Sequence, residues 1–426
     1  MARVRSMSAS SLALDNLRAV VILIVLAFHS VLAYIAWIPA RSVGFDEPPY
    51  GWRAFPILDS HRWFGFDLFC AWQDVYLMTL LFLLSGLFVW PSLQRKRNWG
   101  FARDRLLRLG IPFIFGVIVL VPIAVYPAYR VTAADPGIAA YLRSYFALPF
   151  VPNGQLWFLW QLLALNVIVA GLNWIAPDAL KILGRWSAAL GRHPLTYLGV
   201  LFGAAVVAYV PLAVAFTPWA WSDSGPLAVQ FSRPLLYAVF FFAGLGIGAG
   251  GIDNGLVAAN GALARRWWLW LALALVTLFL WMGVTSLTLQ EGPVPVAIKV
   301  LSDFSFALAC VAGCSFLFAA SLRFGLKPSR ALASLSANAY SLYLVHYAFV
   351  VWMQYALLPA NLPAVIKAPI VFVVALVASW IVVLAVQRVP FGARLIGAPL
   401  PATAALAKRP QVPAGLYARL RQIVSL

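Results

Sequence analysis

Charged residues are scarce in this chain. Only 10% of its 426 residues are Asp, Glu, Lys or Arg, whereas 63% are hydrophobic and the mean hydropathy is +0.88. A typical soluble domain has about 25% charged residues, so too few are present here to cover a surface that faces water. This scarcity excludes a soluble enzyme, a disordered protein and a nucleic-acid-binding protein.

Cysteine and acidic residues are also few. The three cysteines, Cys70, Cys310 and Cys314, are an odd number within apolar stretches, which excludes a disulfide framework and a zinc-binding spacing. Only 13 acidic residues oppose 31 Lys and Arg, which gives a net charge of +18. In so apolar a chain, this excess indicates basic loops on the cytoplasmic side of a membrane.

Long apolar stretches are abundant instead. A helix needs about 20 mostly apolar residues to cross a bilayer. Ten stretches approach or exceed this length, and they predict an all-α, polytopic membrane protein with about ten transmembrane helices. They are residues 17–37, 75–90, 109–126, 156–175, 196–216, 235–250, 267–286, 297–320, 335–358 and 368–386.

The distribution of basic residues predicts the orientation. Most Lys and Arg residues lie before the first stretch, in every second connection and after the last stretch. Because ten spans return the chain to its starting side, the positive-inside rule places both termini in the cytoplasm. The chain is then a transmembrane domain over residues 1–387, in contact with membrane lipids, followed by a basic cytoplasmic tail over 388–426.

Two ionisable residues lie on one face of the first stretch. Arg18 and His29 are eleven residues apart, which is close to three full helical turns and places them about 16.5 Å apart along the axis. Polar residues within a membrane are costly and often functional. The His29 imidazole can accept a proton from an alcohol because its ordinary pKa is near neutrality. The alternative is a structural histidine that is hydrogen-bonded by a neighbouring helix.

A second group of basic residues precedes the third stretch. Arg105 and Arg108 are three residues apart, so a helix presents both guanidinium groups on one face at the cytoplasmic surface. This geometry suits phosphate. Lipid headgroups offer the same chemistry, and the sequence does not choose between the two ligands.

Two further ionisable groups lie in later stretches. His346 is near the middle of the ninth, where a structural role and a place in a cavity are both open. Asp303, in the eighth, is four residues after Lys299, so it either forms an ion pair with that lysine or orients a histidine. No grouping of side chains has the spacing of a metal site.

Glycine does not form a nucleotide-binding motif here. Gly246, Gly248 and Gly251 fit the pattern G-x-G-x-x-G, but neither a strand nor a βαβ unit surrounds them. Close packing between helices through Gly244 and Gly248 explains these residues better.

Five strings in order resemble the bacterial integral-membrane acyltransferase 3 family. LDNLRAVVILIVLAFH (14–29) resembles its opening span, LLFLLSG (80–86) its second span, and RLLRLGIP (105–112) its Arg-x-x-Arg pair. GQLWFL (154–159) and YSLYLVH (340–346) resemble later signatures. The resemblance extends from about residue 14 to residue 386 and includes the glucan biosynthesis protein C branch of succinyltransferases.

The resemblance implies that an acyl group is moved from a cytoplasmic donor of the acyl-coenzyme A type to a hydroxyl of a carbohydrate or related acceptor at the outer face. His29 would be the general base and Arg18 would help to bind the donor, whose phosphate end Arg105 and Arg108 would hold. On the resemblance alone, the residues that line the cavity are His346, Trp157 and Ser85. It implies a bacterial inner-membrane O-acyltransferase with acyl-coenzyme A as a co-substrate and no permanently bound cofactor.

A multi-pass transporter or flippase of an envelope precursor is the alternative. Intramembrane His and Arg residues also occur in transporters, together with spans that Gly and Pro interrupt. The sequence has no visible repeat symmetry and few charged residues within the apolar stretches, which favours the acyltransferase.

Overall fold

The computed structural model of the chain describes residues 8–37, 44–222, 225–253, 255–290 and 292–398. Within these residues the regular elements are helices, with one isolated β-bridge between Trp221 and Gln230 and no strand. The predicted all-α fold is therefore confirmed. Most of the predicted tail, residues 399–426, lies outside the described residues, and the part that is described includes the short helix α16.

Long helices coincide with most of the apolar stretches, and shorter or more polar helices lie between them. Their bounds are α1 Ala9–Val31, α2 Phe64–Leu87, α3 Val89–Arg105, α4 Ile111–Phe115, α5 Val121–Thr132, α6 Ile138–Ala147, α7 Trp157–Ile175, α8 Pro177–Leu190, α9 Pro194–Phe216, α10 Pro234–Gly250, α11 Ala262–Arg265, α12 Trp267–Thr288, α13 Val296–Phe324, α14 Arg330–Ala356, α15 Ala364–Val386 and α16 Pro390–Leu395.

Eight of the helical segments in the described part of the chain are long and apolar enough to cross a membrane. This finding confirms a multi-pass membrane protein. The other two predicted stretches are also helical, but α10 has 17 residues, and the 27-residue α14 is more polar than these eight. The count of ten spans and the cytoplasmic location of the termini remain predictions.

The third stretch belongs to a much longer helical segment, Val89–Thr132, which is not straight. Arg97 interrupts α3 with φ 59° and ψ 172°. Two π-helical turns, η3 (Leu106–Gly110) and η4 (Gly116–Leu120), separate α3, α4 and α5. Such turns contain extra residues and often occur at functional sites. Here η3 begins directly after Arg105 and contains Arg108.

Helices α2 and α10 pack closely because glycines remove the side chains between them. A Cβ atom added at Gly244 would lie 2.0 Å from the Leu83 carbonyl oxygen, and one at Gly248 would lie 2.1 Å from the Leu87 oxygen. The predicted close packing is confirmed. Cys310 packs against α2, where its thiol donates a hydrogen bond to the backbone carbonyl of Val75.

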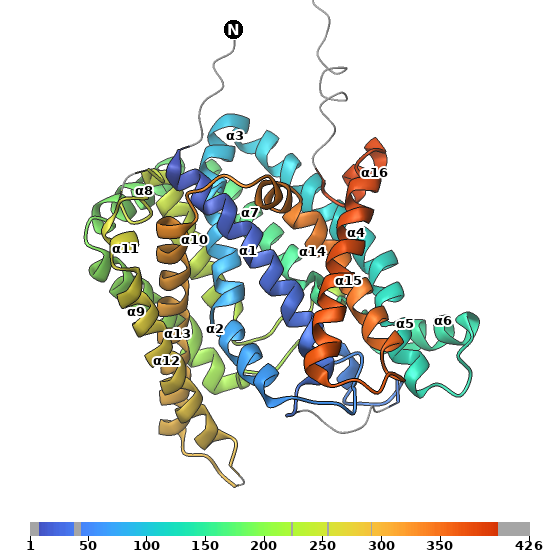
Figure 1. Cartoon of the computed structure of the whole chain (residues 1–426). Coiled ribbons are helices and arrows are strands. Elements are labelled where there is room, and N and C mark those ends of the chain that lie inside the picture. The colour runs from blue at the N-terminus through green and yellow to red at the C-terminus, as the bar shows by residue number, and fades with distance from the viewer. Residues whose placement is uncertain (1–7, 38–43, 223–224, 254, 291, 399–426) are drawn as a thin grey trace, which may run out of the picture.

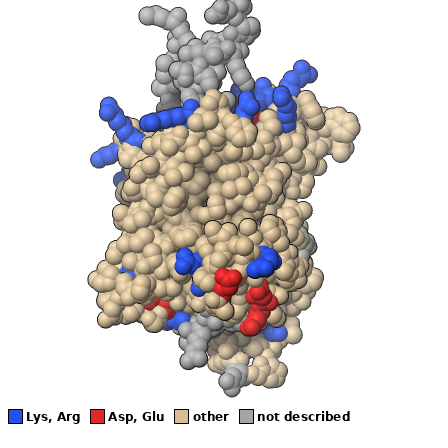
Figure 2. All heavy atoms as spheres, turned by 90° about the vertical axis from the view of Figure 1, so that its right-hand side faces the viewer, with Lys and Arg blue, Asp and Glu red and all other residues tan. Residues whose placement is uncertain are grey.

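Helix α14 packs against both α1 and α15 (Figure 1). Helices α9, α12 and α13 form a group to one side of α1, and α4, α5 and α15 lie on the other (Figure 1). Figure 2 shows Lys and Arg concentrated at the end where α3 and α16 lie, whereas most Asp and Glu residues of that face lie toward the opposite end together with further Lys and Arg residues.

Candidate active site

Two histidines meet where α1 crosses α14. The Nε2 atom of His346 lies 3.1 Å from the Nδ1 atom of His29, and the ring centroids are 5.0 Å apart. His346 is fully buried, whereas His29 is partly exposed. Arg18 and His29 were predicted to share a face of the first helix. The structure adds that this face of α1 places His29 against α14.

The hydrogen bonds of these rings define where their protons lie. His29 Nδ1 is 2.9 Å from the Val25 carbonyl oxygen, and His346 Nδ1 is 2.7 Å from that of Tyr343. A carbonyl only accepts, so both Nδ1 atoms carry the proton when the rings are neutral. His346 Nε2 is then the acceptor for His29 Nδ1–H. His29 Nε2 consequently has a free lone pair, and no protein partner occupies it in the described part of the chain.

Neighbouring side chains hold both rings in place. The Gln354 amide donates to the backbone carbonyl of His29 at 2.9 Å, and the Tyr347 ring packs against His29 edge to face, with centroids 5.1 Å apart. On the other side, the Tyr343 hydroxyl donates to the Gln155 carbonyl, and the Gln155 amide donates to the Leu344 carbonyl. These contacts connect the histidine pair to the beginning of α7.

Arg18 lies in the N-terminal half of α1. Its guanidinium is 3.1 Å from Asp15 Oδ1 and lies over the Phe88 ring, 4.6 Å from its centroid. The side chain is 34% exposed, so part of it remains open to a ligand. Arg18 does not contact His29, in agreement with the predicted separation along the helix.

Arg105 and Arg108 lie at the start of the π-helical turn η3, close enough to interact with each other. The Arg105 guanidinium lies over the buried Phe101 ring at 5.0 Å, and its Nε atom is buried without a hydrogen-bond partner. Arg108 is exposed. Next to Arg108, the buried hydroxyl of Tyr340 also has no partner. These unpartnered donors suit an anionic oxygen ligand.

The remaining predicted residues are separate from one another. Trp157 stacks on Tyr237, with centroids 5.7 Å apart, and Ser85 is half-buried on α2. Asp303 is buried on α13, and among the described residues it forms no ion pair with Lys299 and no hydrogen bond to a histidine. The partner of His29 is therefore a second histidine.

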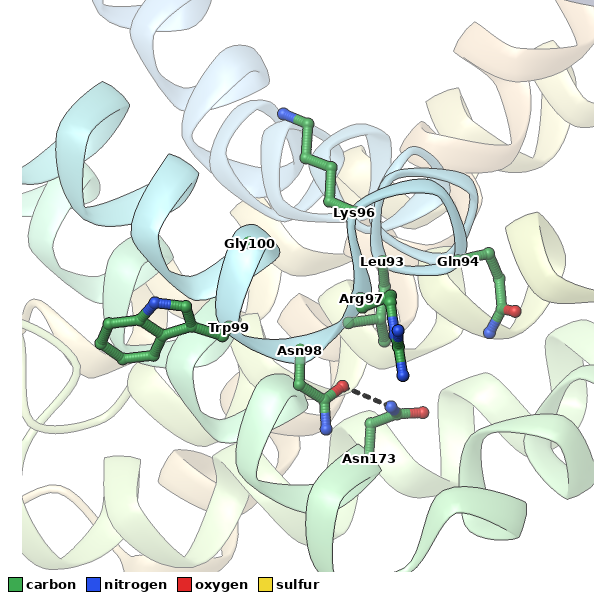
Figure 3. Close-up of a pocket in the computed structure, with 8 residues that line it drawn as sticks. All are labelled: Leu93, Gln94, Lys96, Arg97, Asn98, Trp99, Gly100 and Asn173. Carbon is green, nitrogen blue, oxygen red and sulfur yellow. Dashed lines mark hydrogen bonds between the residues drawn. The ribbon is translucent and has the colours of Figure 1, made fainter.

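A hollow of about 570 Å³ lies at the end of the molecule that is predicted to be cytoplasmic, between the bend of α3 and the end of α7. Figure 3 shows Arg97 and Asn98 reaching from the bend toward Asn173, while Lys96 and Trp99 point elsewhere. The Asn173 amide donates to Asn98 Oδ1 at 2.5 Å. None of the residues that line this hollow was predicted as a site residue.

Sequence reasoning missed several residues of the site. Gln354 is a single amide residue in the apolar sequence near the end of α14. This isolated polar residue is the only feature of the sequence that points to it. The only sequence signal for Gln155 is its place in the string GQLWFL. The contact between His29 and His346 crosses 317 positions of sequence, and no local pattern encodes such a contact.

The arrangement can accept a proton deep in a helical bundle, with cationic groups toward the end that carries the N-terminus of α1. In the described residues, no group of three or more His, Cys, Asp or Glu side chains is suited to hold a metal.

The sequence model of the acyltransferase 3 family, an acyltransferase domain, matches residues 11–384. No curated protein and no solved structure matches the chain. Because the family match covers most of its length, the chain belongs to the acyltransferase 3 family and is a multi-pass membrane acyltransferase.

Proposed function

We propose that this protein transfers an acyl group from cytoplasmic acyl-coenzyme A to a hydroxyl of a carbohydrate acceptor at the outer face of a bacterial inner membrane. The observation that carries the proposal is the contact between His29 and His346. Its hydrogen bonds direct both Nδ1 protons to acceptors and leave His29 Nε2 as an unprotonated base.

In the proposed reaction, His29 Nε2 takes the proton of the acceptor hydroxyl as its oxygen attacks the thioester carbonyl. A new ester C–O bond forms, the C–S bond breaks, and the thiolate leaves with the electron pair. The proton then passes from His29 to the thiolate, which gives free coenzyme A and the neutral base. Base catalysis of this kind contributes about 10²–10⁴-fold in rate.

His346 positions and polarises His29. When His29 gains its second proton, the ring becomes cationic, and the Nε2 atom of His346 accepts from the charged Nδ1–H. A hydrogen bond to a charged donor is stronger than one between neutral groups. His346 therefore has the orienting role that a carboxylate has in other catalytic groups of this type.

The donor is proposed to enter from the cytoplasmic end. Arg105 and Arg108 would hold its phosphates, and the unpartnered Arg105 Nε atom supports this role. Arg18 would contact the donor further into the bundle. Acyl-coenzyme A is a co-substrate in this proposal, and no cofactor is permanently bound.

The acceptor is proposed to approach from the opposite end. There, the ring centroids of Trp157 and Trp221 are 5.8 Å apart, and Trp221 is 40% exposed. Aromatic faces of this kind offer apolar contact to sugar rings. The resemblance to the acyltransferase 3 family supports a carbohydrate or related acceptor.

The test uses purified protein in lipid vesicles with radiolabelled acyl-coenzyme A and an extract of envelope carbohydrates. His29→Ala is expected to lower acyl transfer by about 10²–10⁴-fold, because the base is lost. His193→Ala is the matched control, since His193 is an exposed histidine just before α9. Thermal unfolding of all three proteins checks that the variants remain folded.

Unchanged transfer in folded His29→Ala would overturn the assignment of the base. A transporter or flippase gives a different result, in which a labelled envelope precursor moves across sealed vesicles without any acyl donor. That result, combined with no consumption of acyl-coenzyme A, would replace the proposed function by the transport alternative.

A further inference from the structure

Asn166 and Asn173 share one face of α7, because they are seven residues apart and at 100° per residue this returns to within about 20° of the same direction. Gln155 lies two residues before the helix in the 3-10 turn η5 (Gly154–Leu156), 11 and 18 positions before these two asparagines. We call these three amide residues the amide face of α7. Eighteen residues rise about 27 Å, which is close to the thickness of the hydrocarbon core of a bilayer.

The ends of this amide face are fixed by contacts. At one end, Gln155 is bonded to α14 at the level of the histidine pair. At the other, Asn173 is bonded to Asn98 in the bend of α3 and lines the hollow there. The amide face of α7 therefore runs from the proposed base to that hollow.

Two groups on the amide face lack hydrogen-bond partners. Asn166 is 2% exposed and its Nδ2 atom donates to the Leu162 carbonyl, but its buried Oδ1 atom has no partner. The Oε1 atom of Gln155 is likewise buried and unpartnered. Leaving a buried acceptor unsatisfied costs about 1–3 kcal/mol in general, and a ligand that donates a hydrogen bond to either oxygen would remove that cost.

The hollow at the end of the amide face combines charge with backbone strain. Arg97 has φ 59° and ψ 172°, a region that glycine favours. Its exposed guanidinium has no ion-pair or hydrogen-bond partner within the described residues. Strained residues are frequent at ligand-binding sites. A volume of about 570 Å³ falls within the usual range for small-molecule sites.

We propose that the hollow beside Arg97 binds the nucleotide end of the donor, and that the amide face of α7 binds its pantetheine arm. This inference rests on the proposed function. Arg97 would contact a phosphate, and the amides of Asn98 and Asn173 would bond to polar atoms of the nucleotide. The pantetheine arm has two amide N–H groups only a few bonds apart, and one of them would donate to the unpartnered oxygen of Asn166. The thioester then lies at the level of His29.

The test separates the two ends of the ligand by binding alone. Affinities for coenzyme A and for adenosine 3′,5′-bisphosphate, which lacks the arm, are measured by titration calorimetry on detergent-solubilised protein. Arg97→Gly removes the guanidinium and relieves the backbone, so lost binding cannot come from unfolding. It is expected to weaken both ligands about tenfold, the loss of one charge-assisted hydrogen bond.

Asn166→Leu is expected to weaken coenzyme A about tenfold and to leave adenosine 3′,5′-bisphosphate unchanged, because only the arm reaches this position. Arg185→Gln is the matched control. It removes an exposed positive charge from α8, outside the hollow, and is expected to change neither affinity.

The two proposals fail in different ways. If Arg97→Gly and Asn166→Leu leave every affinity unchanged while the wild type transfers acyl groups, the placement of the donor is wrong and the proposed function stands. If the affinities change as expected but no acyl transfer occurs, the binding site stands and the proposed function is wrong. If Arg185→Gln weakens both ligands as much as Arg97→Gly, binding is general attraction to basic residues and the site is overturned.

Discussion

The Nζ atom of Lys367 lies 2.7 Å from Oδ2 of Asp59, and both side chains are almost fully buried. This ion pair connects the segment before α2 to the first turn of α15. Asp59 also accepts a hydrogen bond from the backbone N–H of His61 at 2.8 Å. His61 in turn contacts Asn361, just before α15, at 3.1 Å. Together these contacts hold the connection between α1 and α2 against the end of the bundle.

Lys367→Met is expected to destabilise the protein by about 3–5 kcal/mol, because it leaves the Asp59 carboxylate buried without its partner. The double variant Asp59→Leu, Lys367→Met is expected to recover much of that loss, since no buried charge remains. Thermal unfolding in detergent measures both. Equal destabilisation by the single and double variants would contradict this explanation.

Lys181→Met on α8 is the control for the buried pair. Lys181 Nζ lies 2.9 Å from Asp178 Oδ1 at the surface, where its hydrogen bond holds the pKa of the Asp178 carboxyl below its usual value. Exposed pairs contribute little because water screens them. We therefore expect no measurable change in the unfolding midpoint at neutral pH.

His346→Phe is expected to lower kcat by about 10- to 100-fold, less than the loss of the base itself, with little change in KM for the donor. The reason is that the phenyl ring has no nitrogen to accept the hydrogen bond from His29 Nδ1–H. His346→Gln offers an acceptor oxygen and should retain more activity. Initial rates at varied donor concentration measure both parameters, and equal activity of the two variants would show that hydrogen bonding is irrelevant.

The double change Arg105→Ala, Arg108→Ala is expected to raise KM for acyl-coenzyme A about tenfold or more, while kcat changes less. In the proposed function, both guanidinium groups bind the phosphates of the donor and take no part in the proton transfer. Saturation kinetics with the intact donor measure the effect. An unchanged KM would remove the phosphate-binding role from this pair.

Gly244→Val is expected to prevent stable folding. Its Cβ atom would lie 2.0 Å from the backbone carbonyl oxygen of Leu83, and this oxygen cannot move away without displacing α2. Gly283→Ala is the matched control within another helix. Nothing lies within 4 Å of a Cβ atom there, and alanine favours helix more than glycine does. The yield of monodisperse protein in detergent distinguishes the two, and normal folding of Gly244→Val would contradict the close approach.

The sequence alone determined the fold class, the apolar helices and the family. Hydrophobicity and length decide whether a segment crosses a membrane, and both are local properties. Helical periodicity also placed Arg18 and His29 on one face. The sequence also predicted that Gly244 packs against a neighbouring helix. Small residues spaced four apart on a helix allow another helix to approach closely.

Only the tertiary structure decided which polar groups meet. His29 pairs with His346 and not with Asp303, because the crossing of α1 and α14 sets that distance. Lys367, one residue before the predicted tenth stretch, is buried and forms an ion pair with Asp59. Contacts of this kind join residues that are hundreds of positions apart, so no sequence period records them. Long-range packing of the helices fixes them, and it thereby determines which nitrogen of His29 is left free.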